Sequence, residues 1–265
     1  MIAMNANATG MAAAREAPPR LAELLAKQRP DWHSEWAWAN YKSTLVDLVR
    51  ADHLRHLCEI GGGRDPSFTA EEAAELGITL TINDISATEL EKAPPGFPTA
   101  CFDVSGDIAA AGIAPGQFDL MFSRMVFEHV KDVRQAWRNI HTLLAPGGVA
   151  VAFFPTLYSL PFLANHLMPE WLSSAIVRAF YPNRGEETDD PKFPAVYDWC
   201  FSSEARMLPM LRDCGFSDVA IQPFWGHGYF KRLPVVRQID DAFNALAARR
   251  DWRSMSAYAY VLVRK

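Results

Sequence analysis

The amino-acid sequence predicts a doubly wound α/β domain, in which helices cover both faces of a mostly parallel seven-stranded sheet. The first observation is an alternation between residues 56 and 154, where short apolar runs typical of buried strands alternate with helical patterns. Such alternation indicates β-α-β units with right-handed crossovers. The second observation is that glycines or acidic residues follow several of these strands, at the sheet edge where ligands bind in this class of fold.

The expected strands and helices follow from apolar periodicity. The strands are expected at residues 56–60, 78–83, 99–104, 118–123, 149–154, 217–223 and 256–264. Helices are expected at residues 21–28, 34–49, 69–76, 131–144, 202–214 and 234–249. Two helices therefore precede the first strand, and Ser34 is expected to cap the second of them.

Length and composition indicate one globular domain rather than two. The chain has 265 residues, of which 49% are hydrophobic, and residues 20–265 are expected to form a single domain. Residues 1–19 are rich in alanine and asparagine without apolar periodicity, so a disordered leader is expected there. The four cysteines occur singly, which indicates reduced thiols in a cytoplasmic protein and no metal site.

Charge and the apolar segments argue against two classes of protein. A net charge of −5 and a pI near 5.8 do not fit a nucleic-acid groove, which needs a basic surface. Residues 139–169 contain no fully charged side chain, but Pro146, Pro155 and Pro161 interrupt the stretch. A helix that spans a membrane does not tolerate such a cluster, so no transmembrane segment is expected.

Glycines and acidic residues stand at the ends of the first three strands. Gly61, Gly62 and Gly63 follow the first strand, and glycine lets a backbone pass close beneath a ligand. Asp84 ends the second strand, 23 positions after Gly61, which is the spacing expected of an acid that binds both hydroxyls of a ribose. Asp103 stands in the third strand, where a carboxylate can accept a hydrogen bond from the amine of an adenine.

Five motifs, in this order, resemble the class I S-adenosylmethionine (SAM)-dependent methyltransferase family. They are CEIGGGRDP, TINDIS, CFDVSG, FDLMFSRMVFEHVKD and LLAPGGVAVAFFP, one at each of the first five strands. The resemblance covers about residues 55–155. It implies a Rossmann-like fold, and we expect an antiparallel last strand and an apolar lid inserted after the fifth strand.

The resemblance also implies which residues bind the cofactor SAM, whose product is S-adenosylhomocysteine (SAH). Gly61, Gly62 and Gly63 are expected to pass beneath the methionine part of SAM. Glu59 is expected to support this loop, and Tyr41 is expected to help close the pocket over the methionine.

The nucleoside part of SAM is expected to lie beside the next two strands. Asp84, with the neighbouring Ile85, is implied to bind the ribose. Asp103 and Val104 are implied to bind the adenine, the first by a hydrogen bond and the second by packing on the ring.

The glycine loop departs from the family pattern at one place. The family usually has a third glycine where this chain has Asp65, which Pro66 follows. The departure leaves the backbone path of the loop open. It also argues against a nicotinamide site, because the G-x-G-x-x-G motif would need glycine at position 66.

Methyl transfer from a sulfonium needs alignment and exclusion of water more than a catalytic side chain. Ser123 and Arg124 are implied to face the carboxypropyl or sulfonium group. An oxygen or carbon acceptor would benefit from a base, and His129 is the first candidate because it follows the fourth strand. The alternative is that His129 packs at the start of the next helix, where Glu128 is interpreted as a first-turn acid.

Other polar residues are weaker candidates. His227 follows the sixth strand and could also face the acceptor. His33 lies among tryptophans that are more typical of a core. Tyr197 and Asp198 are interpreted as part of a solvated loop.

Residues 156–200 are expected to form the lid, or substrate insertion. The apolar run 157–181 indicates an amphipathic or lipid-like acceptor. Transient contact with a membrane surface is one alternative, although a lid helix packed on the sheet is the simpler interpretation. The sequence carries no signal for an oligomeric state.

Three functions are compatible with these patterns. The first is a SAM-dependent methyltransferase that acts on a small or lipid-like molecule, with no nucleic-acid partner. The second is a SAM-binding regulatory protein without turnover, because cofactor residues alone do not prove catalysis. The third is a nicotinamide-dependent oxidoreductase, which Pro66 and the lack of a Tyr-x-x-x-Lys pair disfavour.

Overall fold

The computed structural model describes residues 20–157, 195–228, 230 and 234–265. Seven strands form one sheet in the order β3-β2-β1-β4-β5-β7-β6. They are β1 (His56–Ile60), β2 (Thr79–Asp84), β3 (Thr99–Cys101), β4 (Phe118–Arg124), β5 (Leu144–Pro155), β6 (Asp218–Phe224) and β7 (Tyr258–Arg264). β7 runs antiparallel to both of its neighbours, and the other pairs are parallel. The predicted sheet, with its antiparallel last strand, is confirmed.

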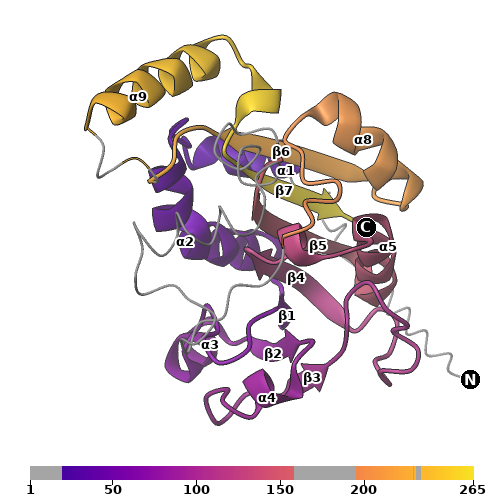
Figure 1. Ribbon diagram of the computed structural model, residues 1–265. Coiled ribbons are helices and arrows are strands. Elements are labelled where there is room, and N and C mark those ends of the chain that lie inside the picture. The colour runs from indigo at the N-terminus through magenta and orange to yellow at the C-terminus, as the bar shows by residue number, and fades with distance from the viewer. Residues whose placement is uncertain (1–19, 158–194, 229, 231–233) are drawn as a thin grey trace, which may run out of the picture.

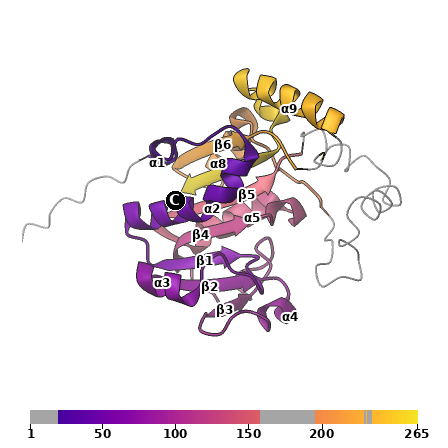
Figure 2. The same ribbon diagram turned by 90° about the vertical axis from the view of Figure 1, so that its left-hand side faces the viewer.

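Helices cover both faces of this sheet, with α1, α2 and α3 on one face and α5 and α8 on the other (Figures 1 and 2). The α-helices are α1 (Leu21–Lys27), α2 (Ser34–Asp52), α3 (Ala70–Leu76), α4 (Ala87–Leu90), α5 (Val133–Leu143), α8 (Glu204–Asp213) and α9 (Pro234–Arg249). Two short 3₁₀ helices, η1 (Phe127–His129) and η2 (Arg253–Met255), complete the described elements.

The core is continuous between the helices and the sheet. α2 buries Tyr41 and Leu45, which are four positions apart and so share one face of the helix. α5 buries Trp137 against the opposite face of the sheet. β7 is buried along its whole length, and the hydroxyl of Tyr260 donates a hydrogen bond to the carbonyl of Ala37. The first long helix and the last strand therefore share one core.

Strand order reverses between β1 and β4. The chain leaves β1 toward β2 and β3, then returns to β4 on the other side of β1. Ile60 consequently lies opposite both Asn83 and Ser123. The segments that follow these three residues emerge side by side, at the type of crevice where open α/β sheets bind their ligands.

The start of α2 differs from the expectation that Ser34 is its cap. The cap is His33, whose Nδ1 accepts a hydrogen bond of 3.2 Å from the backbone N–H of Glu35. An isolated bridge to Trp225 holds His33 in an extended conformation, and the Ser34 N–H donates to the Trp225 carbonyl at 2.8 Å. The helix therefore begins at Ser34 itself.

Two expectations fall on residues outside the described part of the chain. These are the disordered leader at residues 1–19 and the lid helix within 158–181. Among the helices that the structure describes, none is long and apolar enough to cross a lipid bilayer.

Candidate functional site

Three glycines lead the chain out of β1 at the switch point. Gly61 and Gly63 have φ angles of 69° and 43°, a left-handed conformation that glycine adopts without steric cost. A Cβ atom on Gly61 would lie 2.5 Å from a methyl group of Val126, just after β4. One on Gly63 would lie 2.9 Å from a carboxylate oxygen of Asp84, at the end of β2. The loop is therefore closely fitted between the ends of β2 and β4.

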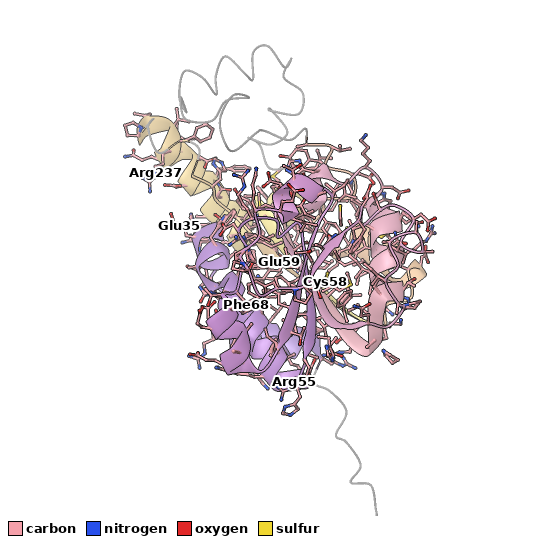
Figure 3. The ribbon with its side chains drawn as sticks, turned by 90° about the horizontal axis from the view of Figure 1, so that it is seen from below. Glu35, Arg55, Cys58, Glu59, Phe68 and Arg237 are labelled. Carbon is pink, nitrogen blue, oxygen red and sulfur yellow. The ribbon has the colours of Figure 1, made fainter. Side chains whose placement is uncertain are left out.

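Glu59 braces this loop from inside the molecule, where Figure 3 shows it next to Cys58. Its carboxylate accepts hydrogen bonds from the Ser67 backbone N–H at 2.8 Å and from the Ser67 hydroxyl at 2.5 Å. Burial raises the pKa of Glu59, and the hydrogen bonds from Ser67 oppose that shift. A Cβ atom on Gly62 would lie 3.1 Å from the Cγ of Glu59, so the acid lies directly against the loop.

The structure explains why Asp65 can stand where the family has glycine. The φ angle of Asp65 is not positive, so the position does not need the freedom of glycine. Its N–H donates to the Gly62 carbonyl at 3.0 Å and closes a turn. The chain then reaches Thr69, which caps α3 in a reciprocal arrangement with Glu72. These hydrogen bonds fix the backbone path of the glycine loop although Asp65 replaces the third glycine.

Asp84 ends β2 with its carboxylate beside the glycine loop. Oδ1 accepts a hydrogen bond of 2.8 Å from the Ser86 N–H, which fixes the side chain in a local turn. Oδ2 is the oxygen nearest to Gly63. Ile85 follows with 68% of its surface exposed, so an apolar side chain stands in solvent next to the carboxylate.

Asp103 and Val104 lie beyond β3, because that strand ends at Cys101 and not at Val104 as expected. Asp103 Oδ1 accepts from the N–H and the hydroxyl of Ser105, both at 2.8 Å, and this turn redirects the chain away from the sheet. The Asp103 side chain is exposed. Val104 is buried, and its carbonyl accepts a hydrogen bond of 2.9 Å from Asn139 of α5.

The end of β4 contains a buried hydroxyl that lacks a partner. Ser123 is 1% exposed, and its Oγ has no hydrogen-bond partner among the residues that the structure describes. Its carbonyl accepts from the hydroxyl of Tyr41 at 2.8 Å. Arg124, the next residue, is exposed. Tyr41 thus braces β4 from within the core, and its expected contact with the methionine of SAM stays a prediction.

These observations fit a cofactor with the hydroxyl and other polar groups of SAM. Buried polar atoms in folded proteins normally have partners, and a polar group of a ligand could be the partner that the Oγ of Ser123 lacks. The loop through Gly61 and Gly63 brings main chain to the same edge, where side chains would block a close approach. The fixed carboxylate of Asp84 supplies an acceptor for hydroxyl groups.

The expectation that Glu128 is a first-turn acid of the helix after β4 is wrong, because α5 begins only at Val133. Glu128 lies in η1, before the cap residue of α5, and its side chain is buried. One oxygen, Oε2, has no hydrogen-bond partner in the described part of the chain. The other lies 3.8 Å from Nε2 of His129, which is about one-third exposed. Burial raises the pKa of Glu128 to about 8. The apolar residues Met125, Val126 and Phe127, which directly precede Glu128, were the sequence signal that could have indicated its burial.

The segment 195–201 packs over Glu128. The N–H groups of Val196 and Tyr197 donate to the Glu128 carbonyl at 2.7 and 3.0 Å. Asp198 accepts from the N–H of Val133, at the start of α5, at 3.1 Å. Tyr197 is 6% exposed, so the expected solvated loop is instead a packed segment.

This packed segment is also strained. Tyr197 and Trp199 have φ angles of 56° and 48°, a left-handed conformation that costs bulky residues of the order of 1–3 kcal/mol each. Such strain persists where surrounding contacts enforce it, and it is frequent at functional sites.

His227 and His33 belong to a different cluster. His227 follows β6, which is separated from β4 by β5 and β7. Its Nε2 lies 3.2 Å from Asp240 of α9, and that carboxylate also accepts from Asn244 at 3.0 Å. Burial lowers the pKa of His227, although Asp240 opposes the shift. The structure therefore does not bring His227 to the end of β4.

Comparisons with known proteins agree with this geometry. Residues 58–152 match the family model described as a methyltransferase domain. A polyketide synthase–nonribosomal peptide synthetase of Aspergillus clavatus is 37% identical over 128 residues, which cover 44% of this chain and 3% of that protein. The malonyl-[acyl-carrier protein] O-methyltransferase of Pseudescherichia vulneris is 29% identical over 106 residues, which cover 40% of this chain and 41% of that protein.

A solved structure shares the fold. The CurJ carbon methyltransferase superposes with a TM-score of 0.50 at 14% identity, and the match covers 91% of this chain and 58% of that one. The matched regions thus represent a small part of the synthase and less than two-thirds of the other two proteins.

The glycine loop, the sheet order and the match to the family model agree with one another. Over residues 58–152 the chain is similar to methyltransferase domains.

Proposed function

We propose that this chain transfers the methyl group of SAM to a small, amphipathic acceptor at the carboxyl edge of β4 and β5. The observation that carries the proposal is the buried, partly unpaired carboxyl of Glu128 beside His129. These two residues lie five and six positions after Ser123, so a proton-handling pair follows directly on the strand end that would face the cofactor.

The residues around the switch point would hold SAM as the sequence predicts. Gly61, Gly62 and Gly63 would pass beneath the methionine part. Asp84 would accept from the ribose hydroxyls, with Ile85 packing beside it.

The remaining cofactor contacts are proposed at the next strand ends. Asp103 and Val104 would bind the adenine. Ser123, through its unpaired Oγ, and Arg124 would face the carboxypropyl group. SAM supplies an electrophilic methyl group on a good leaving group, so the protein's main task is alignment and exclusion of water.

The protein's own chemical role in the reaction would be to remove a proton from the acceptor. His129 would accept the proton of an oxygen or carbon acid, because its side chain is partly exposed and lies at the same edge as Ser123. Glu128 would be a positioning residue, since its raised pKa keeps it mostly neutral near pH 7 and able to donate a hydrogen bond.

Other aspects of the proposal rest on less specific observations. By their names, one relative given above is a malonyl-[acyl-carrier protein] O-methyltransferase and another is a polyketide synthase–nonribosomal peptide synthetase, which supports an organic acceptor. Residues 20–265 would act as one domain, with 156–200 as the acceptor-side insertion. All four cysteines are free thiols, which supports a cytoplasmic location.

The test has two stages. Calorimetric titration with SAM, SAH and NADH should show saturable binding of both sulfur ligands and none of NADH. Turnover of a panel of carboxylate, enol and amine acceptors should then be detected as SAH release. Binding of SAM without turnover on any acceptor would favour the regulatory alternative.

His129→Gln separates the base from the rest of the site. We expect a loss of kcat of about 10²–10⁴-fold for an oxygen or carbon acid, with the Kd for SAH unchanged. A kcat–pH profile equal to that of the unmodified protein would remove His129 from the mechanism.

A further inference from the structure

An open groove runs along the surface beside the strained segment. It has a volume of about 810 Å³ and lies between the η1–α5 connection, the end of β5 and α8. Its described lining residues are Lys131, Leu157, Val196, Tyr197, Asp198, Trp199, Phe201, Ala205, Arg206 and Pro209. A volume of this size suits a small-molecule ligand.

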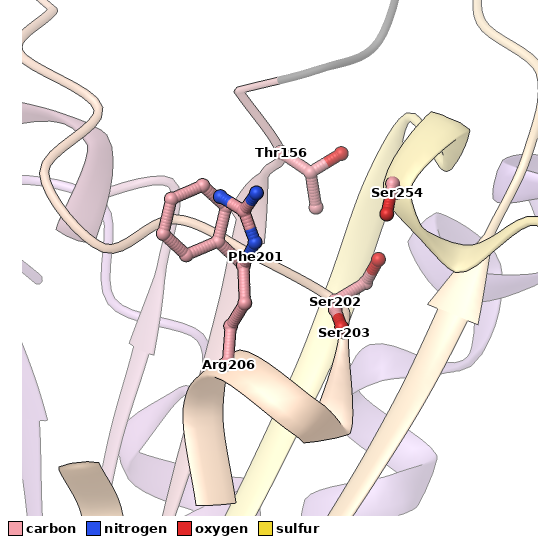
Figure 4. A pocket seen from close by; sticks show the side chains of 6 residues that line it. All are labelled: Thr156, Phe201, Ser202, Ser203, Arg206 and Ser254. Carbon is pink, nitrogen blue, oxygen red and sulfur yellow. The ribbon is translucent and has the colours of Figure 1, made fainter. Parts of the chain in front are cut away.

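Aromatic side chains and cations meet in this groove. The rings of Trp199 and Phe201 lie 6.1 Å apart in an edge-to-face arrangement. The guanidinium of Arg206 lies 4.8 Å from the centre of the Phe201 ring. Figure 4 shows these two side chains next to each other. Arg134 lies 5.2 Å from the centre of the Trp199 ring. Lys131 lines the groove as a further cation.

Two cations and one carboxylate stand among the described lining residues of the groove. Asp198 is the single carboxylate among its described lining residues, and one of its oxygens accepts from the Val133 N–H. Lys131 and Arg206 are both exposed and project from different elements. An anion placed between them would gain from both charges.

A small polar pocket adjoins the groove at Arg206 (Figure 4). It has a volume of about 10 Å³, enough for one water molecule, and shares Phe201 and Arg206 with the groove. Its other lining residues all carry hydroxyls: Thr156, Ser202, Ser203 and Ser254. The polar end of the groove is therefore at Arg206, and its apolar wall is formed by the rings.

The groove is connected to the proposed reaction centre. Val196 and Tyr197, which line it, donate hydrogen bonds to the carbonyl of Glu128. Leu157, two residues after β5, donates its N–H to the Cys200 carbonyl at 3.0 Å. A ligand in the groove would thus contact the segment that covers Glu128.

We propose that this groove binds the acceptor, and that the acceptor is an amphipathic anion. Its apolar body packs on Trp199 and Phe201, and its carboxylate or phosphate lies between Lys131 and Arg206. The inference rests on the proposed function and adds the charge of the substrate and the residues that select it.

The test compares four probes with the same eight-carbon chain: octyl phosphate, octanoate, octanol and octylammonium. Calorimetry should show the two anions binding at least 10-fold more tightly than the alcohol, and the cation most weakly. Arg206→Gln should weaken the anions by about 5–20-fold and leave octanol unchanged. Arg212→Gln, at the exposed end of the same helix, is the matched control and should change nothing.

Three results would overturn the inference. The first is equal affinity for anion, alcohol and cation. The second is an equal effect of Arg206→Gln and Arg212→Gln. The third is binding of an acidic carrier protein, sensitive to Arg206→Gln, without binding of either small anion. The Kd for SAH in each variant distinguishes a failure of the groove from a failure of the cofactor site.

Discussion

The proposed cofactor site and the proposed acceptor groove, which lie on two sides of the same sheet edge, are constructed differently. On the cofactor side, neighbouring strands deliver Gly61 and Asp84 to the same place, and the strand register alone brings them together. On the acceptor side, Lys131, Leu157 and Arg206 are far apart in the chain and meet through a strained segment. The proposed cofactor site is thus a property of the sheet, whereas the proposed acceptor groove depends on how the connection between β5 and α8 packs against it.

The largest expected effect concerns Gly61. Gly61→Ala should weaken SAM binding at least 100-fold and lower the free energy of unfolding by about 2–4 kcal/mol, through left-handed strain and overpacking. Gly112→Ala is the matched control, because its φ of 70° is nearly the same as the 69° of Gly61 but its Cβ would meet open space. Calorimetry and chemical denaturation measure both quantities.

Gly112→Ala should cost about 1–2 kcal/mol in stability and leave the Kd for SAM unchanged. If both variants lost the same stability and kept their affinity, the close fit between the glycine loop and Val126 would have no role in binding.

The next effect concerns the carboxylate at the end of β2. Asp84→Ala should weaken SAM binding by about 1–3 kcal/mol, or roughly 5–150-fold, because hydroxyl groups of the ligand would lose their acceptor. Asp107→Ala is the control, since Asp107 accepts from the N–H two residues ahead, at 3.0 Å, in the same type of turn.

Calorimetric titration of both variants with SAH decides between a ligand contact and a mere turn. Equal affinities of Asp84→Ala and Asp107→Ala would reduce Asp84 to a turn residue.

The smallest effect belongs to the acceptor side and depends on pH. An unfolded Glu128 releases its proton near pH 4.5, whereas the folded protein keeps it until about pH 8. Between these values the unfolded state binds fewer protons, so stability falls as the pH rises. From pH 6 to pH 7 the unmodified protein should lose about 1 kcal/mol more than Glu128→Gln.

Urea denaturation of the two proteins at both pH values measures this difference. Parallel pH dependence would show that Glu128 titrates normally, and the proposed neutral positioning residue would be lost with it.

The sequence predicts where Gly61 and Asp84 lie in the fold better than it predicts the burial of Glu128 and Tyr197, and the reason is physical. The glycines after β1 and the acid at the end of β2 follow strands by fixed offsets, so periodicity places them in space. The burial of Glu128 was not predicted, because a 3₁₀ turn, and not the first turn of α5, determines where its side chain points. The burial of Tyr197 was not predicted either, because Tyr197 contacts Glu128, which is about 70 residues earlier in the chain.

Strand β3 shows the limit on the cofactor side as well. The run 99–104 reads as a continuous strand, but the turn formed by Asp103 and Ser105 ends the pairing at Cys101. Local side-chain hydrogen bonds compete with the ladder, and apolar periodicity does not register that competition.

The position of β7 has a consequence for how the molecule assembles. Among the described strands, β6 pairs with β7 alone, and β7 lies between β5 and β6 although it follows both in the chain. During synthesis, β1 to β5 can therefore join while β6 still has no partner strand. The β6 strand therefore has unpaired edges until residues 258–264 have been synthesised and inserted between β5 and β6, and unpaired strand edges are prone to aggregation.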